Sequence, residues 1–71
     1  MERFGEKLRT LRKRRGMTLK ELAHVLGLSA HSHLSELESG KSQPTSEIVV
    51  KLARLFNVST DQLLLDELDI E

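Results

Sequence analysis

The chain has 71 residues, which is enough for one small domain with a single core and too few for two. It contains no cysteine, and its longest aliphatic runs are three residues. Composition therefore excludes a disulfide framework, a thiolate metal site and a membrane span, and it predicts a cytoplasmic protein. The 11 basic and 11 acidic residues give a net charge of zero, which argues against binding to nucleic acid through overall charge alone.

Five short helices are expected from apolar residues spaced three or four positions apart, and no segment alternates as a strand would. A composition rich in leucine and poor in glycine and proline also favours an all-α fold, with a compact five-helix bundle as its architecture. The predicted helices cover about residues 2–15, 19–26, 30–38, 46–56 and 60–66, in a domain over residues 1–66 that precedes an acidic C-terminal tail at residues 67–71.

The expected helix starts carry local signals. Thr18 with Glu21, and Ser59 with Gln62, match the capping-box pattern, in which each side chain bonds the other residue's backbone N–H group. Ser29 is the best N-cap residue between the second and third helices. The third helix is therefore expected to begin directly after it.

The second and third helices form the most informative part of the chain. Leu22 and Ala23 share one face of the second helix, Leu34 and Leu37 share one face of the third, and Gly27 begins the turn between them. Two short amphipathic helices packed across a turn, behind a basic first helix, predict a helix-turn-helix that binds DNA.

Charge is unevenly distributed along the sequence. The first 20 residues hold eight basic side chains against two acidic ones, a net charge of +6, and residues 21–71 hold three against nine, a net charge of −6. One part of the surface should therefore attract phosphate while another repels it, which orients the molecule on a polyanion. Four consecutive basic residues at 12–15 make a merely solvated helix face the less favoured explanation.

A longer pattern runs from a capping threonine through Leu-Ala, Gly-x-Ser and an aliphatic-Ser-x-aliphatic-Glu-x-Gly segment to a proline. Its members are Thr18, Leu22, Ala23, Gly27, Ser29, Leu34, Ser35, Leu37, Glu38, Gly40 and Pro44. Over about residues 3–65 the chain resembles the phage repressor and Cro type of helix-turn-helix domain, the XRE family. The resemblance implies a lambda-repressor-like fold and sequence-specific binding to double-stranded DNA, usually as a homodimer on an inverted repeat, in transcriptional control.

One spacing departs from that family. Gly27 and Gly40 are 13 positions apart, one more than the family typically has, so an extra residue lies in the turn or at the start of the third helix. Counting forward from Gly27 places Ala30 and His31 at the start of the recognition helix, whereas counting back from Gly40 places His31 and Ser32 there. His31 satisfies both counts and is therefore the first candidate for contact with a base.

The recognition helix of such a domain enters the major groove with its N-terminal turn toward the bases, so residues 30–38 are expected there. Histidine, serine and alanine can each contact a base edge, and glutamate can accept a hydrogen bond from cytosine. The expected base-contacting residues are Ala30, His31, Ser32, Ser35 and Glu36. None is arginine or lysine, so much of the binding energy must come from phosphate contacts.

Phosphate contacts are expected at the two helix N-termini and at lysines that flank the helix pair. The candidates are Thr18, Leu19, Lys20, Ser29, Lys41 and Ser42. Leu19 is a second departure, because the family commonly has a glutamine there that supports phosphate contact. Apolar residues that remain after the core is filled predict a two-fold dimer contact, and they are Val50, Leu55, Leu65 and Leu68.

The combined prediction is a dimeric transcriptional regulator of the repressor type, associated with the nucleoid. One alternative stays open, a protein-interaction module such as an antitoxin-like or adaptor domain with weak or no DNA specificity. Glu36 and Glu38 on the recognition helix, Leu19 in place of glutamine, and the acidic tail support it. The salt dependence of duplex binding separates the two hypotheses, because DNA-binding proteins show a steep slope.

No enzyme activity, cofactor, metal ion or small-molecule ligand is expected. His31 and His33 are two positions apart on a helix, so they point to different faces and cannot share a metal ion. Serine and histidine residues are present, but a domain this small has no oxyanion loop or enclosed pocket to support nucleophilic catalysis.

Overall fold

The computed structural model describes residues 2–70, and helices are the regular secondary structure of that range. The expected all-α fold with five helices is confirmed, and none of these helices is long and apolar enough to cross a membrane. Met1 and Glu71, the outer ends of the expected domain and tail, lie outside the described residues. The helices are α1 (Phe4–Arg14), α2 (Leu19–Val25), α3 (Ser32–Ser39), α4 (Ser46–Phe56) and α5 (Thr60–Leu64).

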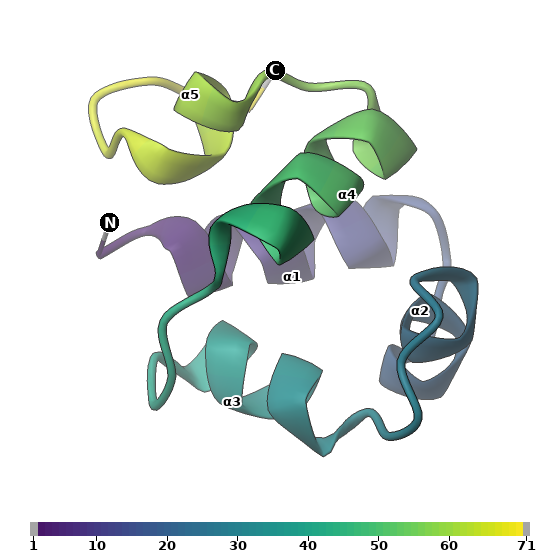
Figure 1. Ribbon diagram of the computed structural model, residues 1–71. Coiled ribbons are helices and arrows are strands. Elements are labelled where there is room, and N and C mark those ends of the chain that lie inside the picture. Colours follow the sequence, from purple (N-terminus) through teal and green to yellow (C-terminus); the bar gives the residue numbers. More distant parts are fainter. Residues whose placement is uncertain (1, 71) are drawn as a thin grey trace.

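Figure 1 shows α4 in front of α1, with α5 above them, α2 to one side and α3 below. Helix α1 contacts α3 and α5, α4 contacts α5, and α2 contacts α3. The apolar side chains between these helices form one core, as expected for a chain of this length. Leucines from every helix have almost no exposed surface there, namely Leu8, Leu22, Leu34, Leu52 and Leu63.

Helices α1 and α3 approach each other most closely at Gly5. A Cβ atom at this position would lie 2.5 Å from the backbone oxygens of both Leu37 and Glu38, a distance that real Cβ contacts do not adopt. Only glycine fits there without a shift of backbone. The separation of α1 and α3, and thus the position of α3 on the molecule, depends on this missing side chain.

The local capping signals are confirmed. Thr18 Oγ1 accepts a hydrogen bond from the Glu21 N–H at 3.0 Å, and the Thr18 N–H donates to Glu21 Oε1 at 2.8 Å. Ser59 and Gln62 form the same reciprocal pair before α5. These bonds satisfy first-turn N–H groups that have no acceptor within the helix itself.

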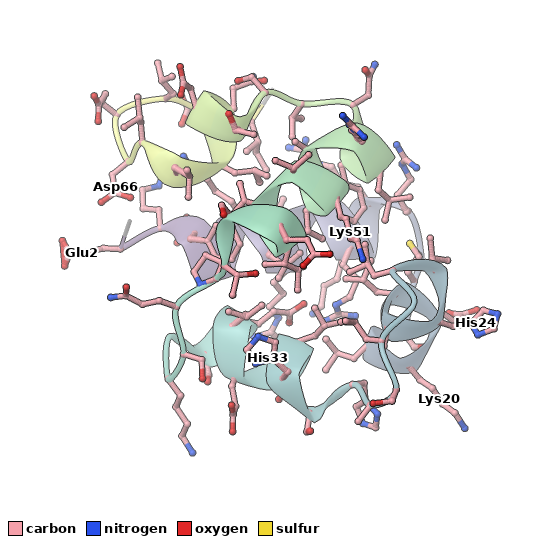
Figure 2. The ribbon with its side chains drawn as sticks, viewed as in Figure 1. Glu2, Lys20, His24, His33, Lys51 and Asp66 are labelled. Carbon is pink, nitrogen blue, oxygen red and sulfur yellow. The ribbon has the colours of Figure 1, made fainter. Side chains whose placement is uncertain are left out.

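Helices α1 and α5 are shorter than expected by more than one residue. The N–H groups of Glu2 and Arg3 donate to the carboxylate of Asp66 at 3.0 and 2.9 Å, so these residues precede α1 instead of beginning it (Figure 2). Helix α5 ends at Leu64 because Leu65 is extended, with φ of −91° and ψ of 119°. The chain then turns back toward the start of α1.

The C-terminal residues pack against the domain. Ile70 is 8% exposed and belongs to the core. Lys7, which is 1% exposed, donates through Nζ to the carbonyl oxygens of Gln62, Leu65 and Leu68 at 2.6–2.8 Å. Lys7 therefore bonds residues on both sides of the expected domain boundary at residue 66. Together with the burial of Ile70, this packs the described part of the expected tail against the domain.

Acid is expected to weaken the contact between the two chain ends. Hydrogen bonds from the N–H groups of Arg3 and Glu2 hold the pKa of the Asp66 carboxyl below its ordinary value. Because the pKa is depressed in the folded state, this stabilisation is present above about pH 4, the unfolded pKa, and is lost as the pH falls through the folded pKa. Asp66→Asn should lower the thermal unfolding midpoint at neutral pH. On acidification the midpoint of this variant should fall by less than the midpoint of the wild type.

Glu67→Gln is the matched control for this prediction. Glu67 is an exposed carboxylate of the same segment and has no hydrogen bond or ion pair within residues 2–70. Its variant should follow the wild-type pH profile. Identical profiles for wild type and Asp66→Asn would show that the Asp66 contact does not contribute to acid sensitivity.

Candidate nucleic-acid interface

Helix α3 presents a polar face to solvent at one end of the molecule. Leu34 and Leu37 point into the core. Helical spacing places Ser32, Ser35 and Glu36 on the opposite side, and all three are exposed. Figure 1 shows α3 as the lowest element, with α5 at the other end of the view, so this face lies far from α5.

The turn that precedes α3 differs from the expectation. Gly27 ends α2 in the left-handed conformation, with φ of 76°, and the Leu28 N–H bonds back onto α2 at 2.9 Å. Leu28 packs against the core, Ser29 is exposed in a bend, and α3 begins only at Ser32, with His31 before it and no side-chain cap. The prediction that Ser29 caps the third helix is wrong, because the anchoring of Leu28 outweighs a local capping preference.

The residue that makes the spacing from Gly27 to Gly40 one longer than in the family thus lies in the turn before α3. Counting back from Gly40, and not forward from Gly27, gives the observed helix start. Ala30 and His31 precede α3, Ser32 is its first residue, and all three are exposed. His33 is exposed as well, on the side of α3 turned toward the viewer in Figure 2. It is absent from the sequence-based candidates, which lie on the side of the expected helix opposite Leu34 and Leu37.

The segment after α3 folds back onto Glu36. Gly40 has a left-handed φ of 84°, and the Lys41 N–H donates to the Glu36 carbonyl oxygen at 2.9 Å. Ser42 Oγ donates to Glu36 Oε1 at 3.0 Å. Lys41 and Ser42, two of the expected phosphate contacts, are thus held beside the C-terminal end of α3, and the Lys41 side chain is exposed.

The start of α2 holds the other expected phosphate contacts. Leu19 packs partly against the core, so its backbone N–H is the group that it can offer to a ligand. Lys20 is exposed and extends away from α2 (Figure 2). Thr18 uses its oxygen to accept from Glu21 and keeps its hydroxyl hydrogen for another acceptor. The same pair holds the pKa of the Glu21 carboxyl below its ordinary value, because the Thr18 N–H donates to it.

Two of the four consecutive basic residues at the end of α1 are used within the fold. Arg12 Nε and Nη2 contact the two carboxylate oxygens of Glu38 at 2.7 and 3.1 Å, and Nη1 donates to the Met17 carbonyl oxygen at 2.8 Å. The bond to Glu38 raises the pKa of Arg12. Arg15 lies over the Phe56 ring, 5.4 Å from its centroid. Glu38 is therefore neutralised inside the fold, which removes one support for the protein-interaction alternative.

The chemistry available at the α3 face is hydrogen bonding by serine, histidine and glutamate, with exposed lysines on either flank. Within residues 2–70, no three histidine, aspartate or glutamate side chains gather as metal ligands would. His24 extends from α2 into solvent, well apart from His33 on α3 (Figure 2). A polar helix face between two cations matches the requirements of a groove lined with phosphates.

Comparisons with known proteins agree with this geometry. Residues 8–63 match the family model described as Helix-turn-helix. The chain is 38% identical over 61 residues to the HTH-type transcriptional regulator ImmR of Bacillus subtilis (strain 168). This alignment covers 86% of this chain and 47% of ImmR, so the chain spans about half the length of that relative. It is 37% identical over 62 residues to the uncharacterized HTH-type transcriptional regulator YazB of the same organism, covering 87% of this chain and 88% of YazB. The solved N-terminal DNA-binding domain of SinR from Bacillus subtilis aligns with a TM-score of 0.83 and 29% identity over 94% of this chain and 97% of that one.

Proposed function

We propose that the chain binds double-stranded DNA sequence-specifically as a dimeric repressor, because it belongs to the Helix-turn-helix family of the phage repressor and Cro type. Its relatives in that family are transcriptional regulators and not enzymes. The observation that carries the proposal is the outward face of α3, where hydrogen-bonding side chains lie between exposed lysines. A helix of this kind fits the major groove. The protein acts in the cytoplasm, with the nucleoid, and a dimer on its operator represses by excluding other proteins from the site.

Base contacts come from the N-terminal part of α3 and the turn before it. His31 and Ser32 enter the groove first, where histidine can donate to or accept from a purine edge. Ala30 contacts a thymine methyl group, and Ser35 and Glu36 extend the contact along the helix. All five side chains are exposed, which leaves them available to bases.

Phosphate contacts supply most of the affinity, because the base-contacting set has no arginine or lysine. Lys20 and Lys41 provide the positive charge on the two flanks, and both are exposed. Neutral groups complete the set at each flank. The proposed phosphate contacts are Thr18, Leu19, Lys20, Ser29 and Lys41. Ser42, which was expected in this set, lies at the same edge, but its hydroxyl hydrogen is donated to Glu36 and is not available to a phosphate.

The dimer forms through apolar side chains on α4 and on the segment that follows α5. Val50, Leu65 and Leu68 are 39–41% exposed, and Leu55 on α4 is half-buried. Helix α5 and the segment after it lie at the opposite end of Figure 1 from α3, so a two-fold contact there leaves both recognition helices exposed. Two linked half-sites then offset the modest affinity of one.

Leu65→Glu is expected to weaken self-association at least about tenfold, because a carboxylate would be buried in the contact. Sedimentation equilibrium measures the effect directly. Val25→Glu is the matched control, since Val25 is 54% exposed on α2, away from this surface, and its variant should dimerise like the wild type. A wild-type monomer, or equal effects of both substitutions, would contradict the proposed interface.

Selection of random double-stranded DNA by the purified chain, near physiological salt, tests the function itself. A short inverted repeat is the expected result, and its half-site spacing gives the distance between the two recognition helices. A single asymmetric motif would contradict the dimer. Folded protein that enriches no motif would contradict the whole proposal and favour a protein-interaction module.

Two substitutions should affect binding in different ways. His31→Ala should weaken the preferred duplex about tenfold and relax specificity at one position, because a base contact is lost. Lys41→Ala should weaken all duplexes alike and reduce the slope of log affinity against log salt by about one, because a phosphate contact is lost. Lys13→Ala, an exposed lysine of α1, should change neither quantity. Uniform weakening by His31→Ala would contradict its role as a base contact.

A further inference from the structure

Glu36 lies at the centre of the outward face of α3. Ser32 is one helical turn before it, and Leu34 and Leu37 occupy the opposite side of the helix. Within residues 2–70 its carboxylate forms no ion pair, and its hydrogen-bond donor is the hydroxyl of Ser42. A carboxylate in this position is repelled by phosphates, so its presence calls for a compensating contact in the groove.

The position of Ser42 is set by the backbone before its side chain acts. Gly40 adopts the left-handed conformation that ends α3, and the N–H groups of Lys41 and Ser42 donate to the Glu36 carbonyl oxygen at 2.9 and 3.4 Å. The Ser42 side chain is half-buried. The loop thus holds the Ser42 hydroxyl next to the Glu36 carboxylate, and the 3.0 Å bond from Oγ to Oε1 joins them.

The hydroxyl of Ser42 has a single hydrogen to donate, and in this structure it is donated to Glu36. A phosphate oxygen only accepts hydrogen bonds, so the side chain cannot serve Glu36 and a phosphate at the same time. A carboxylate, in contrast, has several acceptor sites, and one bond from Ser42 leaves Glu36 able to accept another.

We propose that Ser42 is a positioning residue that holds Glu36 in place to accept a hydrogen bond from the N4 amino group of a cytosine in the major groove. The inference rests on the proposed function of α3 as the recognition helix. Glutamate has several rotatable bonds, and ordering it before binding removes a cost that would otherwise fall on the complex. Ser42 therefore sets a base preference at one position of the half-site without contacting DNA itself.

The test measures affinities for the selected duplex and for every single-base variant of its half-site, with purified wild-type, Glu36→Ala, Ser42→Ala, Ser42→Thr and Ser39→Ala chains. The wild type should prefer cytosine about tenfold at one position, and Glu36→Ala should lose that preference. Ser42→Ala should reduce the same preference to about threefold or less and leave the other positions unchanged. Ser42→Thr, which keeps the hydroxyl, should restore it.

Ser39→Ala is the matched control, because Ser39 Oγ donates to the backbone oxygen of Glu36 at 3.1 Å and not to its carboxylate. It should keep the cytosine preference. Equal weakening of all duplexes by Ser42→Ala would overturn the proposal in favour of a phosphate contact. An unchanged cytosine preference in Ser42→Ala would overturn the proposal too, because Glu36 would then act without Ser42. A wild type without any preferred sequence would overturn the proposed function as well, whereas a sequence-specific wild type with an indifferent Ser42→Ala overturns this inference alone.

Discussion

Lys7→Met is expected to lower the free energy of unfolding by about 3 kcal/mol or more, because three hydrogen bonds from a charged group are lost together. In a domain of this size that loss lowers the midpoint of thermal unfolding by about 15 °C. Methionine is similar to lysine in length and flexibility and fills the buried space, but it has no N–H to donate. Thermal and urea unfolding of the purified variant measure both quantities.

The size of this effect follows from where Lys7 lies. Its Nζ donates to the carbonyl oxygens of Gln62, Leu65 and Leu68, so the three hydrogens of the ammonium group have three acceptors. The side chain is 1% exposed, so water cannot replace a lost donor. Small domains are stable by about 0.05–0.15 kcal/mol per residue, and this one contact network is therefore a large part of the total.

Lys13→Met controls for the loss of a lysine from α1. Lys13 is on the same helix and exposed, so its substitution should change stability by no more than about 0.5 kcal/mol. Equal stability of Lys7→Met and Lys13→Met would show that the three carbonyl contacts contribute nothing net. A large loss in both would point to charge on α1 and not to the hydrogen bonds of Lys7.

Features of this fold that depend on neighbouring residues were predictable. The capping box of Thr18 and Glu21, the one of Ser59 and Gln62, and the order of the helices all follow from side chains three or four positions apart. Such signals describe contacts that a short segment makes with itself. They carry no information about what the rest of the chain does to that segment.

Features that depend on distant residues were not predictable. Ser29 does not cap α3, because Leu28 is held against the core. The residues after α5 pack on α1, because Lys7 donates to carbonyl oxygens that lie 55–61 positions away in the sequence. Charge counting placed Lys7 with the exposed basic residues, although it is buried. In the candidate site the exposed residues of α3 could be anticipated from helical spacing, whereas the bond from Ser42 to Glu36 required the geometry of the loop.

Arg12→Met is expected to lower the free energy of unfolding by about 3 kcal/mol, because it leaves the Glu38 carboxylate buried without its partner. Arg12 contacts both carboxylate oxygens, and the two side chains are only 12% and 9% exposed. Water therefore screens this pair far less than an ion pair on the surface. Glu38→Leu should cost a similar amount, because it leaves the guanidinium unpaired.

The double variant Arg12→Met, Glu38→Leu decides whether the cost belongs to the pair or to its members. Removing both charges leaves no buried ion, so the double variant should recover to within about 1 kcal/mol of the wild type. Recovery should stay incomplete, because the Met17 carbonyl still loses the bond from Arg12 Nη1. Additive losses in a urea-unfolding double-mutant cycle would contradict the coupling of the two residues.

The ion pair also joins α1 to α3, and the backbone of Glu38 lies at the close approach to Gly5. A stable double variant with weakened DNA binding would therefore show that the ion pair serves to orient the recognition helix more than to stabilise the fold.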